Sequence, residues 1–162
     1  MRRLVLMRHA KTRASHPRGD HSRELLPTGI QDAQEAGRQL RPLGLEHALV
    51  STATRARQTF AALGLDIPVE YLDDLYHEGT DALLRHIGET DPAVNGLLVV
   101  GHAPTIPALA SHLGNASDSR EADRLQCWYP TSTFTEFTFD DDWSSLAPFE
   151  LGHVRMERTI RR

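Results

Sequence analysis

Short apolar runs that alternate with helical segments constrain the fold of this chain more than any other feature. The runs LVLM at 4–7, ALVS at 48–51 and LLVV at 97–100 carry one polar side chain between them, the closing serine of the second. Such runs are typical of strands buried on both faces of a parallel sheet. The stretches between them are long enough for crossover helices, so the order of elements predicts an α/β fold.

The helices are predicted from periodicity and from signals at their ends. Thr28 and Gln31 form a capping-box pattern, and apolar residues then recur at helical spacing, which predicts a helix over about 29–40. Further helices are expected over 54–63, over 81–87 and in the polar stretch near 119–126. The segment 11–27 is rich in charge and contains two prolines and a glycine, so we interpret it as a loop.

The remaining strands complete a sheet with a late antiparallel edge. VEYL at 69–72 is a third strand in chain order, and STFTEFTF at 132–139 and FELGHVRM at 149–156 are expected to form a closing pair around a turn at 140–143. The predicted fold class is therefore α/β, a three-layer sandwich whose central sheet is mostly parallel with an antiparallel edge strand. We expect a single domain over 1–162.

Composition disfavours several classes of partner. The net charge is −4 and the 18 basic residues are scattered rather than gathered in one stripe, so nucleic acid is not an expected partner. Cys127 is the single cysteine, which excludes an internal disulfide and a CxxC metal pair. The apolar run near the amino terminus is too short for a signal peptide or a membrane span. We expect a cytoplasmic protein with no membrane partner.

Basic and imidazole side chains follow the predicted strands. Arg8 and His9 come directly after the first strand, Arg55 begins the helix after the second, and His102 follows the strand at 97–100. Ligands of parallel sheets bind beyond the carboxyl ends of the strands, so these residues should meet at one rim. Guanidinium groups match phosphate oxygens in geometry and charge. We therefore predict a phosphate site made of Arg8, Arg55 and His102, with the Thr12 hydroxyl as a further donor.

His9 is the predicted nucleophile of this site. Two neighbouring guanidinium groups disfavour its imidazolium form, so the pKa of His9 should lie below the unperturbed value of about 6.5. A neutral imidazole can attack phosphorus, and His102 would stabilise the charge that develops on the phosphoryl oxygens. This chemistry requires neither a metal nor a cofactor, and the sequence contains no metal-ligand spacing such as HExxH.

These residues carry a family resemblance. MRHAKT at 7–12, an R-x-L-x-x-x-G pattern over 23–29, S-x-x-x-R-A-x-Q-T at 51–59 and VVGHAP at 99–104 resemble the histidine phosphatase superfamily, in particular its SixA-type phosphohistidine phosphatases. The resemblance covers about residues 1–110. It implies a phosphoglycerate mutase-like fold and a two-step reaction in which His9 takes the phosphoryl group and water then removes it. It also implies that Arg8, Arg55 and His102 bind phosphate.

The sequence departs from the larger relatives after the third strand. The phosphoglycerate mutase branch has an L-x-E pattern there that supplies a general acid, whereas here Leu75 is followed by Tyr76 and His77, with Asp74 and Glu78 as the possible acids. The segment is also too short to hold a cap domain. An open site without a certain acid suits a protein-borne phosphohistidine, because an imidazole leaves readily once it is protonated.

Two other functions remain open from the sequence. A broad-specificity phosphomonoesterase would act on small phosphorylated metabolites and would use Glu78 or Asp74 as its acid. A phosphoprotein-binding module without catalysis is the third possibility, because a fold alone does not guarantee chemistry. The complete set of Arg8, His9, Arg55 and His102 favours an enzyme.

Overall fold

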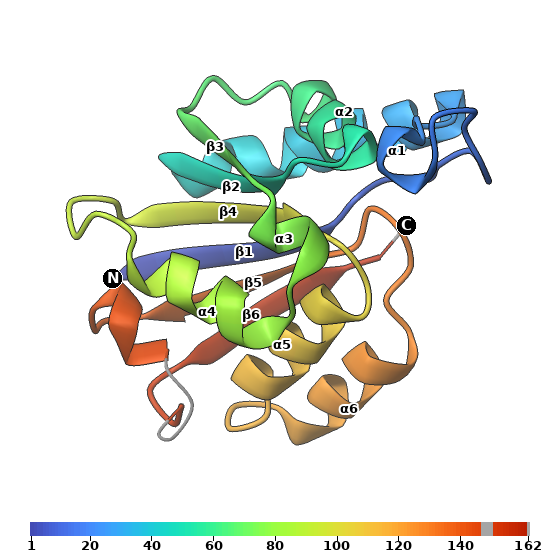
Figure 1. The fold of residues 1–162 in the computed structure, drawn as a ribbon. Helices are drawn as coiled ribbons and strands as arrows, with labels where there is room; N and C mark the ends of the chain where they lie inside the picture. Colours follow the sequence, from blue (N-terminus) through green and yellow to red (C-terminus); the bar gives the residue numbers. More distant parts are fainter. Residues whose placement is uncertain (147–150, 162) are drawn as a thin grey trace.

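A six-stranded mixed sheet forms the centre of the molecule. The computed structural model describes residues 1–146 and 151–161. The strand order is β3-β2-β4-β1-β5-β6 (Figure 1). β3, β2, β4 and β1 run parallel, β5 is antiparallel to β1, and β6 is antiparallel to β5. The predicted α/β class with an antiparallel edge is thus confirmed. The strands are β1 (Arg2–Arg8), β2 (His47–Ser51), β3 (Val69–Leu72), β4 (Gly96–Gly101), β5 (Phe134–Phe139) and β6 (Arg155–Ile160).

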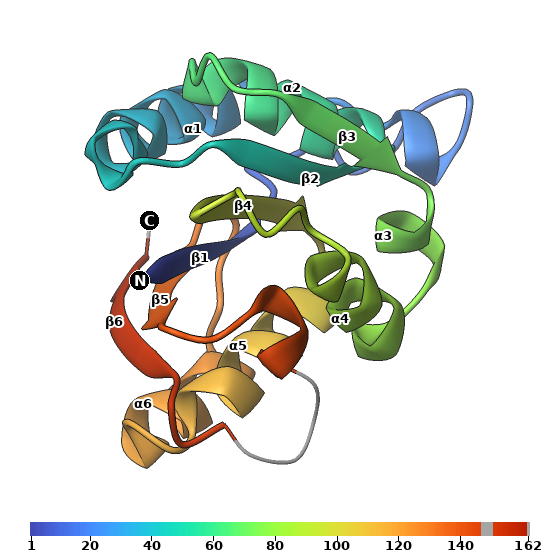
Figure 2. The same ribbon diagram turned by 90° about the vertical axis from the view of Figure 1, so that its left-hand side faces the viewer.

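Helices cover both faces of the sheet. Figures 1 and 2 show α1 and α2 on one face and α4, α5 and α6 on the other, which gives the three layers predicted from the sequence. The helices are α1 (Pro27–Leu40), α2 (Thr54–Leu63), α3 (Asp74–His77), α4 (Thr80–Gly88), α5 (Thr105–Gly114) and α6 (Ser119–Cys127). Short 3₁₀ turns lie at Asp20–Ser22, Arg41–Leu43 and Trp143–Leu146.

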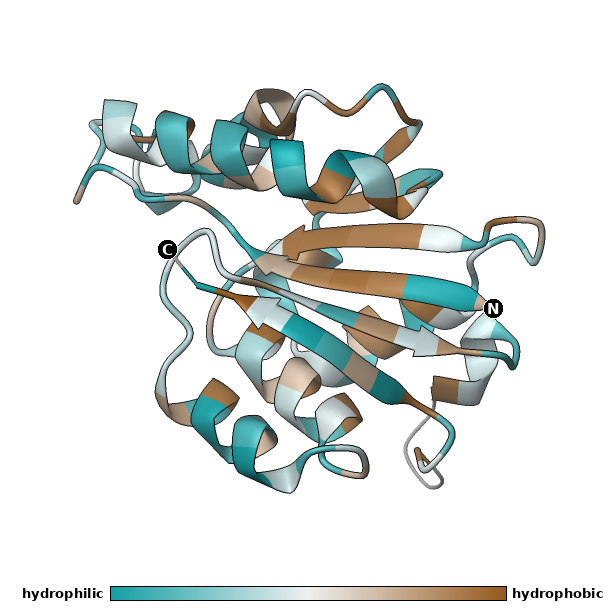
Figure 3. Cartoon of the chain, turned by 180° about the vertical axis from the view of Figure 1, so that it is seen from behind, coloured by the Kyte–Doolittle hydropathy of each residue, from teal (hydrophilic) through white to brown (hydrophobic). Residues whose placement is uncertain are grey.

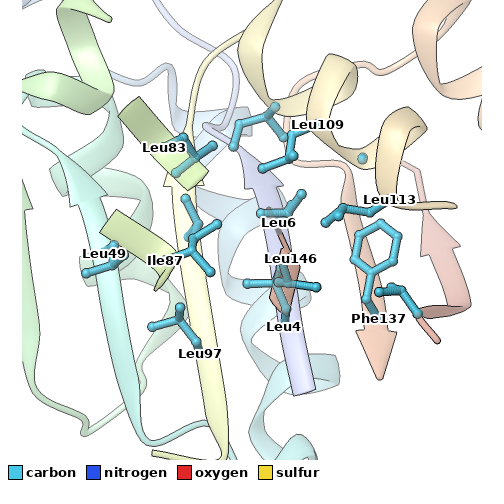
Figure 4. Packing of buried hydrophobic residues seen from close by; sticks show 14 of the residues in the cluster. Leu4, Leu6, Leu49, Leu83, Ile87, Leu97, Leu109, Leu113, Phe137 and Leu146 are labelled. Carbon is cyan, nitrogen blue, oxygen red and sulfur yellow. The ribbon is translucent and has the colours of Figure 1, made fainter. Parts of the chain in front are cut away.

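The two central strands β1 and β4 are buried on both faces. Leu4 and Leu6 of β1 pack on the side of α4 and α5 together with Leu97 (Figure 4), whereas Val5 and Met7 pack on the side of α1 and α2. All five side chains are fully buried. Apolar colour therefore covers most of β4 and the part of β1 that follows its hydrophilic start in Figure 3. This arrangement explains why these strands appear in the sequence as continuous apolar runs rather than as alternating ones.

Two glycines of α1 let backbones approach closely. A Cβ atom at Gly37 would collide with the carbonyl oxygen of Leu63, where α1 packs against α2. A Cβ atom at Gly29 would collide with the backbone of Lys11, so the first turn of α1 sits directly on the loop that follows His9. Gly29 is therefore required to bring this helix next to the candidate site.

The structure corrects two details of the sequence analysis. α1 begins at Pro27, its N-cap is Leu26, and no side chain caps it, so the capping box at Thr28 is wrong; a proline suits the first helical turn because its missing N–H needs no partner there. The last strand, predicted at 149–156, lies at Arg155–Ile160. β6 is an edge strand with many charged residues, so an apolar pattern is a poor guide to its position. Residues 149–150 lie outside the described part of the chain.

The carboxyl ends of β1, β2 and β4 lie at one edge of the sheet because these strands are parallel. Between β3 and α4 the chain forms only the short helix α3, so this edge carries no cap domain. Among the described residues, no helix combines the length and the apolar character that crossing a membrane requires.

Candidate active site

His9 lies where β1 ends and the backbone leaves the sheet. β1 stops at Arg8, and the His9 side chain is only 6% exposed. Its Nδ1–H donates to the carbonyl oxygen of Ala10 over 2.8 Å. A carbonyl oxygen can only accept, so the proton of a neutral His9 is on Nδ1 and the lone pair is on Nε2. Nε2 is therefore the nitrogen available for attack on phosphorus.

The electrostatic environment keeps His9 neutral. The pKa of His9 is lowered to about 3, and burial is the main cause. The bond to Ala10 acts in the opposite direction, whereas electrostatic repulsion from His102, Arg55 and Arg8 contributes to the lowering. The predicted direction of this pKa shift is confirmed. Its main cause is burial rather than the two arginines, because removing an imidazolium from water costs more than its repulsion by partly solvated charges.

His102 lies directly after β4 and beside His9. The centroids of the two imidazole rings are 5.2 Å apart. Its Nε2 pairs with the Ser51 hydroxyl at 2.7 Å, whereas Nδ1 is buried without a hydrogen-bond partner in the described part of the chain. Burial, followed by the charge of Arg55, lowers the pKa of His102 to about 4. Both imidazoles are therefore neutral near pH 7.

Arg55 is held by an acidic residue that the sequence analysis did not single out. Its two terminal nitrogens donate to the backbone oxygen of Asp20 at 2.9 Å and to Asp20 Oδ2 at 3.1 Å. The Tyr76 hydroxyl donates to the same Oδ2 at 2.8 Å, and this bond is the main cause of the lowered pKa of Asp20. Asp20 and Tyr76 come from the loop 11–26 and from α3, and no periodic pattern in the sequence indicates that these two segments meet.

Several buried side-chain nitrogens at the site have no hydrogen-bond partner among the described residues. Arg8 donates one terminal nitrogen to the carbonyl oxygen of Tyr129 at 2.9 Å, but its Nε is buried and unpaired in the described part of the chain. Arg55 Nε and His102 Nδ1 are also buried without a hydrogen-bond partner among the described residues. Buried donors are normally paired, and a set of them on two guanidinium groups and an imidazole suits a multiply charged oxyanion.

Two further residues of the 51–59 motif tie neighbouring segments to α2. The Thr59 hydroxyl accepts from the backbone N–H of Ala10 at 2.9 Å and donates to the carbonyl oxygen of Arg55 at 2.7 Å. Gln58 Oε1 accepts from the backbone N–H of Leu25 at 2.8 Å. Neither residue was predicted as a site residue from the sequence, although the motif that contains both was the signal that could have identified them.

The Thr12 hydroxyl is engaged elsewhere in this structure. It donates to the carbonyl oxygen of Arg13 at 2.8 Å and accepts from Arg23 at 2.5 Å. The structure therefore brings Arg8, His9, Arg55 and His102 together and directs Thr12 into a contact within its own loop.

The two possible acids lie apart from these residues. Asp74 accepts from Arg85 at 3.0 Å and from His86 at 2.8 Å, and the hydrogen bond from His86 is the main cause of its lowered pKa. Glu78 is exposed and lines a groove with Asp74, Asp81 and Arg85. Within the described residues, neither carboxyl group contacts His9, and an ionised Asp74 cannot donate a proton near pH 7.

A metal site requires several ligating side chains in one place. Across residues 1–146 and 151–161, no group of three or more histidine, cysteine, aspartate or glutamate residues is arranged to hold a metal ion. Positive charge at the site comes from Arg8 and Arg55, which can stabilise a phosphoryl group directly.

Fold and site together define a class of protein. A buried neutral histidine near two arginines and a second histidine, at the carboxyl edge of a parallel sheet, is the arrangement of a site suited to a phosphorylated substrate, as in a phosphatase. Comparison with known proteins identifies the family to which this chain is similar.

A family model described as the histidine phosphatase superfamily (branch 1) matches residues 4–77. An uncharacterised protein of Mycobacterium tuberculosis is 39% identical over 146 residues, covering 88% of this chain and 92% of its own. The structure of a Nakamurella multipartitia protein assigned as the phosphohistidine phosphatase SixA is 34% identical, with a TM-score of 0.88 over 99% of this chain and 95% of its own. The structure of an Agrobacterium tumefaciens protein, also assigned as SixA, has the same fold. Its TM-score is 0.79 at 24% identity, covering 99% of this chain and 98% of its own.

The chain belongs to the histidine phosphatase superfamily, in its SixA-type branch. It is a phosphatase that acts on phosphorylated substrates and has the phosphoglycerate mutase-like fold without a cap domain.

Proposed function

We propose that this protein removes phosphoryl groups from protein-borne phosphohistidine through a phosphohistidine intermediate on its own His9. The observation that carries the proposal is the bond from His9 Nδ1–H to Ala10, because it leaves the lone pair of a neutral imidazole on Nε2. The charges of Arg55 and Arg8 act on the same imidazole. Nε2 would attack phosphorus as the substrate imidazole leaves, and water would then attack the phosphorus of phospho-His9 to release inorganic phosphate and restore the free imidazole.

Electrostatic stabilisation in this reaction would come from residues that lie around His9. Arg8 and Arg55 would bind the equatorial phosphoryl oxygens, and His102 would donate a further hydrogen bond as charge develops on them. Because these donors are already buried and positioned, little reorganisation is needed in the transition state. Removing one such donor typically lowers the rate by about 10²–10³-fold.

The state of the carboxyl groups supports phosphohistidine as the substrate class. Asp20, the carboxyl group bound to Arg55, has a lowered pKa and is therefore ionised near pH 7. Asp74 forms an ion pair with Arg85 and accepts a hydrogen bond from His86, and Glu78 lies in the groove outside the site. Alkoxide leaving groups need a proton donor, whereas a protonated imidazole leaves as a neutral ring. The uncapped edge of the sheet also favours a folded carrier, which can place its own surface around the site.

Trapping the intermediate tests the mechanism. Rapid quench of the wild type with ³²P-labelled substrate should yield a label that is stable to alkali and labile to acid, as expected for phosphohistidine. His9→Ala should give no label and no turnover, while His112→Ala, an exposed histidine of α5, should behave like the wild type. Label on serine, cysteine or aspartate, or normal turnover by His9→Ala, would exclude the mechanism.

A substrate panel tests the substrate class. The expected order of kcat/KM is phosphohistidine peptide or protein first, aryl phosphate second and alkyl phosphate last, because leaving-group ability falls in that order. Asp74→Asn and Glu78→Gln should leave this order unchanged. If the wild type hydrolyses alkyl phosphates as well as phosphohistidine and either substitution abolishes that activity, the protein is a small-molecule phosphomonoesterase. If no substrate turns over while vanadate binds, it is a phosphate-binding module.

A further inference from the structure

Ser51 is a buried hydroxyl that contacts the second histidine of the site. It is the last residue of β2 and has no exposed surface. Its Oγ lies 2.7 Å from His102 Nε2 and accepts from the backbone N–H of Ala53 at 3.2 Å. The Ser51 hydroxyl therefore has two hydrogen-bond neighbours in the described part of the chain, and one of them is a catalytic imidazole.

The single hydrogen of the Ser51 hydroxyl determines which ring nitrogen of His102 carries a proton. A serine hydroxyl has one hydrogen to donate, and Ala53 N–H cannot accept it. Among the described residues His102 Nε2 is the acceptor that remains, and a nitrogen can accept only if it carries no proton. A neutral His102 must then carry its proton on Nδ1.

The opposite arrangement leaves two groups unsatisfied. If His102 carried its proton on Nε2 and donated it to Ser51, the Ser51 hydrogen would have no acceptor in a fully buried position. Such an unsatisfied group costs about 1–3 kcal/mol. Nδ1 would then present a lone pair to the phosphoryl oxygens, and two lone-pair atoms repel each other.

We propose that Ser51 is a positioning residue that fixes His102 as the Nδ1–H tautomer, so that this N–H can donate to the phosphoryl oxygens of the substrate. His102 Nδ1 is buried without a partner in the described part of the chain, and the centroid of its ring lies 5.2 Å from that of His9, the proposed nucleophile. The role of the N–H toward phosphate rests on the proposed function, whereas the tautomer itself does not.

The tautomer can be read directly in the wild-type protein. Long-range ¹H–¹⁵N spectra of protein with ¹⁵N-labelled histidine, recorded at pH 7.5, distinguish a protonated from an unprotonated ring nitrogen. The His102 signals are assigned by their loss in His102→Gln. We expect Nδ1 to be protonated and Nε2 to be bare, the reverse of the tautomer that a free histidine side chain prefers. A protonated Nε2 in the wild type would overturn the proposal, whatever the activity of the enzyme.

The variant Ser51→Ala tests whether Ser51 fixes the tautomer of His102. Its His102 should revert to the Nε2–H tautomer or to a mixture, with kcat reduced by at least about tenfold but by no more than in His102→Gln. Ser111→Ala is the matched control, because Ser111 is also a buried serine that accepts a side-chain hydrogen bond, from Gln126 on α6. Ser111→Ala should leave both the His102 spectrum and kcat unchanged. An unchanged His102 spectrum in Ser51→Ala would overturn the assigned role.

A double variant separates positioning from general destabilisation. If Ser51 acts through His102, Ser51→Ala should lower kcat no further in the His102→Gln background, whereas independent effects would multiply. Multiplying losses would overturn the proposal. If instead the wild type proves inactive on every phosphorylated substrate but shows Nδ1–H on His102, the proposed function fails and the tautomer assignment holds.

Discussion

Thr59→Val removes one hydroxyl and keeps the shape of a side chain that joins the nucleophile segment to α2. Thr59 and Ala10 are both fully buried, and the Thr59 hydroxyl is the acceptor for the Ala10 backbone N–H. Valine replaces this acceptor with a methyl group and leaves the N–H unsatisfied. The lost bond to the Arg55 carbonyl oxygen matters less, because that oxygen lies within α2, where carbonyl groups accept backbone bonds.

The expected loss of stability in Thr59→Val follows from the unsatisfied backbone N–H of Ala10. An unsatisfied buried donor costs about 1–3 kcal/mol, so the free energy of unfolding should fall by about that amount. The effect on activity has a separate origin, because the carbonyl of Ala10 holds His9 Nδ1. Loosening Ala10 therefore misplaces the nucleophile, and a displacement of about 1 Å can lower the rate by about 10²-fold.

The assay combines urea denaturation with kcat/KM on an aryl phosphate. Thr54→Val is the matched control on the same helix, because the Thr54 hydroxyl makes no hydrogen bond within the described residues. Thr59→Ser keeps the hydroxyl and should retain activity close to wild type while losing some stability through its missing methyl group. The reasoning is refuted if Thr59→Val is as stable and active as Thr54→Val, or if Thr59→Ser loses as much activity as Thr59→Val.

Three other predictions concern charge. Arg55→Ala should abolish vanadate inhibition and most activity, whereas Arg57→Ala should change little. Arg57 is exposed and stacks on Tyr71, with its guanidinium carbon 4.2 Å from the ring centroid. Equal losses of activity in the two variants would contradict the assignment of Arg55 to the site. EDTA should leave activity unchanged, and a loss that a divalent cation restores would show metal dependence. The pKa of His9 is about 3 in the folded protein, below the unfolded value of about 6.5, so only the unfolded state takes up this proton as the pH falls. This contribution to stability is present above pH 6.5 and declines by about 3 kcal/mol by pH 4, so His9→Ala should show a weaker pH dependence in urea denaturation than the wild type; equal dependence would contradict the lowered pKa.

The sheet could be predicted where burial leaves a clear sequence pattern. β1 and β4 are covered on both faces, so their apolar runs placed them within one or two residues. β6 has no strand on its outer side and contains Arg155, Glu157 and Arg158, so the apolar signal shifted the prediction toward the preceding segment. Arg158 instead forms an ion pair with Glu136 of β5, a cross-strand contact that requires the register to be known.

The site was predictable to the extent that its residues follow strands. Arg8 ends β1, His9 follows it and His102 follows β4, and parallel strands bring their carboxyl ends together. Asp20 and Tyr76 were missed because their contact depends on the path of a long loop, which no local pattern determines. Asp74 was considered as an acid from its place in the chain, but helical geometry and α4 direct it to Arg85 and His86.

The segment from the end of β2 through α2 organises the whole site. Arg55 is the proposed phosphate ligand of this segment. Ser51, Gln58 and Thr59 each hold a different neighbour: the second histidine, the end of the loop 11–26 and the residue after His9. Each contact pairs a buried or half-buried polar group that otherwise would be unsatisfied, so these positions are constrained by hydrogen bonding as well as by contact with phosphate. Replacing any of the three should therefore lower activity through a different neighbour, and the losses should not all have the same spectroscopic or stability signature. A site held from one segment in this way is positioned before substrate arrives, which is the condition under which fixed donors stabilise a phosphoryl transition state best.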